Sequence, residues 1–143
     1  MKNPQSAVEV FFHDYARHTD TGDVPELAAC FADTFVAGNP QGAQAVRASD
    51  FALVLPKRIK YFESLGCRRT ELISLEPVEL DRRYVSARTR WRLTFERPGG
   101  EALPLEVEST YLVDTGVQPF RFLVYIAHQD IMEVVKERGI APA

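Results

Sequence analysis

Two side chains, Tyr15 and His128, have the chemistry to donate and to accept a proton if the fold brings them to one cavity. Tyr15 lies on the apolar stripe of a predicted helix, which would turn its hydroxyl inward as a hydrogen-bond donor. His128 ends the last predicted strand in phase with apolar residues, where a neutral imidazole could serve as a base. Each also has a structural interpretation: a helix aromatic whose hydroxyl a neighbour satisfies, and a histidine bonded near the start of the final helix.

Two further aromatic residues, Trp91 and Tyr111, are predicted to share one face of a hairpin, as pocket lining or as core. In segments 84–97 and 101–114 the apolar residues occupy mostly odd positions. Both odd sets share a face only if paired residues have numbers with an even sum, which requires an odd-length connection such as Pro98-Gly99-Gly100. The residues predicted to face the helices are Thr89, Trp91, Val107, Ser109 and Tyr111; those predicted to face away, as an ion-pair ladder, are Arg88, Arg90, Arg92, Glu106 and Glu108.

The elements that position these residues are predicted from hydrophobic spacing and turn chemistry. Three helices come first: one starts at Asn3 and Pro4, a short one includes Phe31, and one follows Ser49 with a kink or restart at Pro56. Helices followed by an antiparallel meander predict an α+β fold rather than a parallel α/β one. Strands are predicted at 35–38, 70–80, 84–97, 101–114 and 119–128, and a closing helix at 130–138.

Composition limits the classes of protein to which the chain could belong. Its 143 residues, 45% of them hydrophobic and 26% charged, predict one globular domain over residues 1–143. A net charge of −3 argues against a nucleic-acid partner, whose usual surface is basic. The sequence has no apolar run long enough for a membrane span and no apolar leader, which predicts a cytoplasmic protein without membrane contact. Cys30 and Cys67 have no metal-ligand spacing, so we expect two reduced thiols and no metal site. We also expect no cofactor.

The order of elements and several short motifs resemble the nuclear-transport-factor-2-like superfamily. The motifs are Tyr15 on the first helix, Gly22-Asp23, Cys30-Phe31-Ala32-Asp33 and Asn39-Pro40-Gln41-Gly42. Together they are similar to the same stretch of bacterial ketosteroid isomerases and of polyketide-cyclase-like members. The resemblance implies a cone-shaped domain, in which three N-terminal helices pack on a strongly curved, mainly antiparallel sheet that a short C-terminal helix follows. It also implies an apolar pocket between helices and sheet.

The resemblance further implies a homodimer that forms through the outer face of the sheet. On that face the sequence predicts the charged ladder together with Leu112, Leu123 and Tyr125. A second copy of the chain is therefore the predicted protein partner.

The sequence departs from the isomerases at two of their three functional positions. Their phenol donor corresponds to Tyr15, which is retained, but their carboxylate base corresponds to Asn39 and their protonated acid to Ser109. An amide cannot accept a proton at neutral pH, and a hydroxyl is a much weaker acid than a carboxyl group. Steroid isomerisation by that mechanism is therefore excluded.

The leading hypothesis is a protein that binds a small apolar or amphipathic molecule in the pocket. A second hypothesis is a cyclase, dehydratase or isomerase that uses Tyr15 and His128, with Asn39 as a polarising group. A third is a protein-interaction module whose cavity is filled by side chains. The predicted ligand-binding residues are Tyr15, Asn39, Trp91, Ser109, Tyr111 and His128.

We predict that the protein has no ketosteroid isomerase activity, and that Asn39→Asp is the change that would create a trace of it. A positioned base contributes roughly 10²–10⁴-fold, which an amide cannot supply. Turnover would stay slow because Ser109 replaces an acid, and losing one strong donor costs roughly 2.7–4 kcal/mol. The assay follows conversion of a β,γ-unsaturated ketosteroid to its conjugated isomer by ultraviolet absorbance. Robust turnover that Tyr15→Phe abolishes would contradict the prediction.

Overall fold

The computed structural model describes residues 4–142, in which two helices, a strand hairpin and a third helix precede four consecutive strands and a final helix. The predicted helix cap Asn3 lies outside these residues. The elements are α1 (Pro4–Thr21), α2 (Val24–Ala29), β1 (Phe31–Asn39), β2 (Gly42–Arg47), α3 (Ala48–Ser64), β3 (Cys67–Glu79), β4 (Tyr84–Glu96), β5 (Ala102–Asp114), β6 (Arg121–Ala127) and α4 (Ile131–Glu137).

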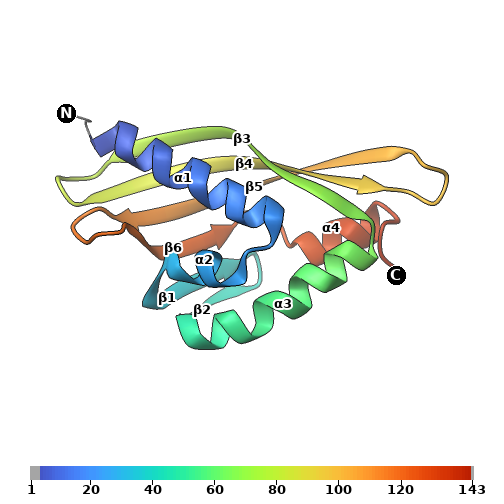
Figure 1. Cartoon of the computed structure of the whole chain (residues 1–143), viewed down its shortest axis with the longest axis horizontal. Helices are drawn as coiled ribbons and strands as arrows, with labels where there is room; N and C mark the ends of the chain where they lie inside the picture. Colours follow the sequence, from blue (N-terminus) through green and yellow to red (C-terminus); the bar gives the residue numbers. More distant parts are fainter. Residues whose placement is uncertain (1–3, 143) are drawn as a thin grey trace.

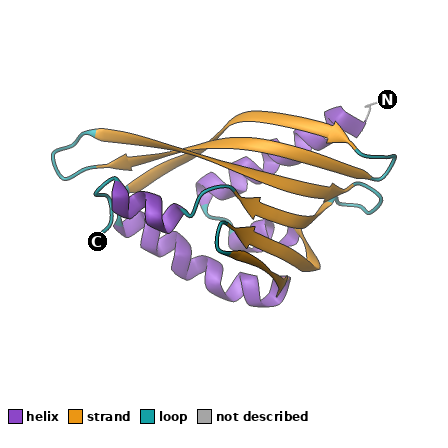
Figure 2. Ribbon diagram, turned by 180° about the vertical axis from the view of Figure 1, so that it is seen from behind, coloured by secondary structure: helices purple, strands orange, loops and turns teal. Residues whose placement is uncertain are grey.

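The strands form one open six-stranded sheet in the order β2-β1-β6-β5-β4-β3. Every neighbouring pair is antiparallel except β1 and β6, which are parallel. Figure 1 shows α1 lying across the long strands β3 to β5, with α3 on the side of the shorter strands. Seen from behind, the long strands lie in front of α1 (Figure 2). The predicted α+β cone, with three helices before the long strands and a short C-terminal helix, is confirmed.

The register of β4 and β5 is the predicted one. Trp91 pairs with Val107 and Thr89 with Ser109, so that paired numbers have an even sum. Trp91, Thr89, Ser109 and Tyr111 are buried on the side of the helices. The predicted ladder on the other face is confirmed by ion pairs of Arg92 with Glu106, at 2.9 Å, and of Arg90 with Glu108, at 3.1 Å, with Arg88 also bound to Glu108.

A bulge changes the facing of β6, and two predictions fail there. Val113 pairs with Phe122 but Leu112 pairs with Val124, so one extra residue enters β6 at Leu123. Phe122 precedes the bulge and is buried, as predicted. Beyond the bulge, Tyr125 and Ala127 face the cavity in place of residues 124 and 126. The predicted positions of Tyr125 on the outer face and of His128 in the pocket are wrong.

The hairpin of β1 and β2 was predicted only in part. Phe31 begins β1 instead of ending α2, and β2 was not predicted at all. β2 is an edge strand whose residues are mostly exposed, so it carries no apolar alternation that could be recognised in the sequence. α3 runs without interruption through Pro56, so the helix does not restart at this residue.

The hydrophobic core consists of two clusters, both of which contact Tyr15 and Leu72. One cluster gathers α1, β1 and β6 around Phe12 and Phe122. The other gathers the ends of α3, β4 and α4 around Phe95. No helix of the described chain has the length and apolar character needed to cross a membrane.

We predict that Gly66→Ala lowers the free energy of unfolding by about 2 kcal/mol or more. Gly66 follows α3 with φ of 98°, and an added Cβ would collide with the backbone oxygen of Glu96. Urea unfolding provides the measurement, and Gly99→Ala is the matched control, since a Cβ there meets nothing within 4 Å. Equal stabilities of the two variants would contradict this account of the turn.

Candidate functional site

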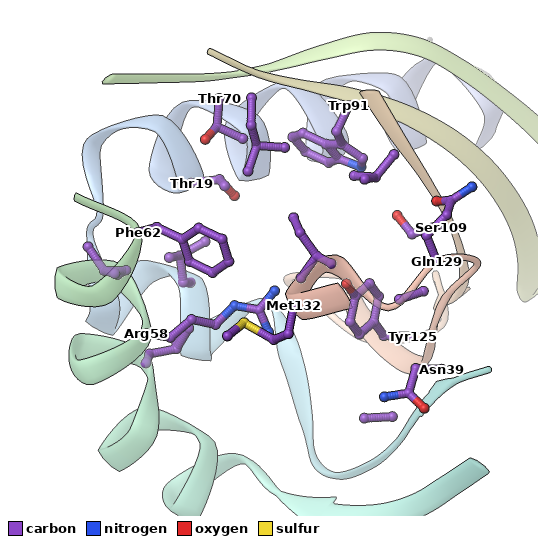
Figure 3. Close-up of a pocket in the computed structure, with 18 of the residues that line it drawn as sticks. Thr19, Asn39, Arg58, Phe62, Thr70, Trp91, Ser109, Tyr125, Gln129 and Met132 are labelled. Carbon is purple, nitrogen blue, oxygen red and sulfur yellow. The ribbon is translucent and has the colours of Figure 1, made fainter. Parts of the chain in front are cut away.

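A cavity of about 800 Å³ opens between α3, the inner face of the sheet and the segment that leads into α4. This volume lies within the range of roughly 300–1,000 Å³ that is usual for small-molecule sites. Figure 3 shows Phe62 and Arg58 on the side of α3, and Trp91, Ser109 and Tyr125 on the side of the sheet. Other apolar lining residues are Leu27, Phe31, Phe51, Leu55, Ile59 and Val107.

A chain of hydrogen bonds holds the polar groups of the sheet wall. The indole Nε1–H of Trp91 donates to Thr89 Oγ1 at 2.8 Å. Thr89 Oγ1 donates to the Ser109 carbonyl oxygen at 2.8 Å and lies 2.8 Å from Ser109 Oγ. Since a threonine hydroxyl has one proton, Ser109 Oγ must be the donor in that second bond. Ser109 therefore offers the cavity a hydrogen-bond acceptor.

Two phenols of the cavity lining, the partly buried Tyr15 and the buried Tyr111, lie close to each other. Their oxygens lie 3.4 Å apart, and the Tyr15 ring packs edge-on against Trp91 with centroids 5.8 Å apart. Burial raises the pKa of both phenols well above the ordinary value of 10, and the positive charge of Arg58 opposes this only weakly at Tyr15. Both hydroxyls therefore stay protonated and act as neutral hydrogen-bond donors or acceptors, not as bases.

Asn39 and Gln129 lie at the edge of the cavity and are held by the backbone. Asn39 is exposed in the β1–β2 turn, and its Oδ1 accepts the backbone N–H of Gln41 at 2.9 Å. Gln129 Oε1 accepts the backbone N–H of Glu108 at 2.8 Å. Each side chain therefore keeps its amide N–H groups free to donate to a ligand, while one lone pair of its oxygen is already engaged. Gln129 lies in the loop before α4 and carried no signal in the sequence.

His128 lies away from the other candidates. Its Nε2 is 2.6 Å from Thr110 Oγ1, and Thr110 belongs to the outward-facing set of β5. The structure thus brings Tyr15, Tyr111, Trp91 and Ser109 to one cavity, with Asn39 at its edge, and leaves His128 on the other face of the sheet.

The carboxylates that line the cavity are mostly engaged in the fold. Asp20 accepts the backbone N–H of Thr70 at 2.8 Å, Glu108 pairs with arginines, and Asp130 caps α4. Glu63 is exposed at the end of α3. Within residues 4–142, no cluster of three or more His, Cys, Asp or Glu side chains could hold a metal ion.

Arg58 is a cavity residue that the sequence reasoning missed. It lies on α3 three residues after Leu55 and four before Phe62, both of which line the cavity. Residues at this helical spacing share one side of α3, so the sequence could have placed the exposed Arg58 on the side that lines the cavity.

The fold recurs in solved structures of low sequence identity. An NTF-2-like protein of unknown function from Shewanella oneidensis MR-1 matches with a TM-score of 0.73 and 12% identity, over 89% of this chain and 100% of that one. A putative polyketide cyclase from Xanthomonas campestris pv. campestris matches with 0.61 and 15%, over 98% and 100%. A putative scytalone dehydratase from Novosphingobium aromaticivorans DSM 12444 matches with 0.67 and 17%, over 86% and 81%.

The chain therefore has the nuclear-transport-factor-2-like fold, as the motifs implied. No protein-family model matches the sequence, and no curated protein matches it. At these identities the likeness defines the fold and leaves the function to be argued from the site.

We predict that stability falls steeply as the pH rises above about 10, because the folded state keeps Tyr15 and Tyr111 protonated where the unfolded state would ionise them. Their contribution is complete below the unfolded pKa and is lost above it, by up to roughly 1.4 kcal/mol per pH unit for each phenol. Tyr15→Phe should reduce the slope of unfolding free energy against pH. Tyr61→Phe, which removes an exposed hydroxyl on α3, is the control, and equal slopes in both variants would contradict the prediction.

Proposed function

We propose that the protein binds a small apolar or amphipathic molecule in the cavity between α3 and the sheet. The observation that carries the proposal is an open volume of about 800 Å³ walled by aromatic and aliphatic side chains. The polar residues of the lining include Tyr15, Tyr111 and Ser109, which offer hydroxyl groups, and Arg58, which offers a guanidinium. Apolar walls with a small number of placed polar groups are typical of small-molecule sites.

The geometry favours binding over proton-transfer catalysis. Catalysis by Tyr15 and His128 would require both within reach of one reacting atom, and the sheet separates them. Tyr15 and Tyr111 could polarise a carbonyl oxygen of a ligand, yet among the described residues no base converges with them. The enzyme hypothesis would therefore depend on a water or on the ligand for its base.

The cavity volume also weighs against the protein-interaction hypothesis, which requires side chains to fill the space. Two aromatic lining residues, Tyr15 and Phe31, pack with each other and with the buried core residue Phe122, at centroid distances of 4.8–6.1 Å. These contacts among the aromatic residues support the cavity walls, so no side chain needs to fill the cavity. Homodimerisation through the outer face of the sheet stays a prediction.

We predict that N-phenyl-1-naphthylamine, a neutral apolar dye, binds in the cavity and accepts excitation energy from Trp91. Trp91 is the one tryptophan of the sequence and lies in the cavity wall, so energy transfer reports binding near this site. Ala127→Phe, which adds a ring on the cavity side of β6, should weaken binding by about tenfold or more because it occupies space that the dye needs.

Ala45→Phe is the matched control, since Ala45 is exposed on the edge strand β2 and does not line the cavity. It should bind the dye as the unchanged protein does. Absence of energy transfer in the unchanged protein, or equal binding by both variants, would contradict the proposed function.

A further inference from the structure

Arg58 is an exposed residue of α3 that also lines the cavity. Figure 3 shows it beside Phe62, with its guanidinium directed towards the side chain of Met132. Its guanidinium carbon lies 5.5 Å from the centre of the Phe62 ring, which is cation–π distance. A positive charge is thus held over an aromatic wall at the opening of an apolar cavity.

Arg58 differs from the other arginines that line the cavity. Arg68 pairs with Glu96 at 3.2 Å, and Arg69 pairs with Glu71 at 3.5 Å. Within residues 4–142, Arg58 forms no ion pair and donates no hydrogen bond. The planar donor fork of this guanidinium is therefore available to a ligand.

The acids that line the cavity do not neutralise Arg58. Asp20, Glu108 and Asp130 accept hydrogen bonds from the backbone or pair with outer-face arginines. Glu63, five residues further along α3, makes no ion pair with Arg58. The cavity therefore combines neutral hydroxyls on the sheet wall with a positive charge on the α3 wall.

We infer that the ligand is an amphipathic organic acid, whose carboxylate is bound by Arg58 while its apolar body lies between Phe62, Trp91 and Tyr125. A guanidinium matches a carboxylate or sulfonate with two parallel hydrogen bonds, which gives both affinity and orientation. The far end of the molecule meets the Ser109 acceptor and the Tyr15 phenol, which suit a hydroxyl or carbonyl group. This inference rests on the proposed small-molecule binding and adds the charge and the orientation of the ligand.

The test uses two dyes that share one aromatic body and differ in charge. 8-Anilinonaphthalene-1-sulfonate carries a sulfonate, and N-phenyl-1-naphthylamine is its neutral counterpart. Dissociation constants of both are measured by energy transfer from Trp91, for the unchanged protein and for Arg58→Gln, Arg58→Lys and Arg69→Gln. Arg69→Gln is the control, because it removes a cavity-lining arginine that already has a carboxylate partner.

We expect Arg58→Gln to weaken binding of the sulfonate about tenfold, the size expected for a charged hydrogen-bond partner, and to leave binding of the neutral dye unchanged. Arg58→Lys should retain part of the sulfonate affinity because it keeps the charge but loses the fork. Unchanged binding of the neutral dye also shows that the cavity of each variant is intact.

The inference is overturned if Arg58→Gln weakens both dyes equally or neither, or if Arg69→Gln has the same effect as Arg58→Gln. These results would leave the proposed function standing, since the neutral dye still binds. Failure of both dyes to bind the unchanged protein would instead overturn the proposed function and this inference with it.

Discussion

The pairing of β4 with β5 in one register determines both faces of the sheet and the sheet wall of the cavity. A slip by one residue would turn Trp91 outward and carry Arg90 into the core. Burial of an unpaired guanidinium costs far more than any packing gain could offset. The buried Thr89 hydroxyl adds a second constraint, because the Trp91 indole N–H and Ser109 both depend on it. The ion-pair ladder outside and the hydroxyl chain inside therefore stabilise the same register.

The cavity depends on this register together with the position of α3. The sheet supplies the neutral hydroxyls of Ser109 and Tyr111, and α1 supplies that of Tyr15; burial keeps both phenols protonated. α3 supplies Phe62 and Arg58 on the opposite wall. An apolar space with hydroxyls at one wall and a positive charge at the other is suited to orient an amphipathic molecule.

The wall formed by β4 and β5 was predictable because its information is local. Odd and even positions differ in polarity, and the short connection at Pro98-Gly99-Gly100 relates the two strands. The helices were predictable for the same reason, since their apolar residues follow helical spacing. The inward placement of Trp91 and Ser109 followed from these patterns.

The facing of β6, the pairing of β2 and the hydrogen-bond partner of Asn39 could not be predicted, because they depend on contacts that the local residue pattern does not encode. A single extra residue at Leu123 reverses the facing of β6, and this moves His128 out of the pocket and Tyr125 into it. β2 is an exposed edge strand without alternation, so its pairing with β1 could be seen only in three dimensions. The role of Asn39 as a turn residue likewise depends on the backbone N–H of Gln41, which the fold brings to it. Arg58 was readable from its spacing, but its lack of an ion pair was not.

The central claim is an open apolar cavity that accepts a small molecule between α3 and the sheet. A crystal structure of the protein grown with N-phenyl-1-naphthylamine tests it most directly. The account predicts one dye molecule in contact with Phe62, Trp91 and Tyr125, with the walls placed as they are here. A structure in which side chains of α3 fill the space, or in which the dye lies only on the outer face of the sheet, would contradict it.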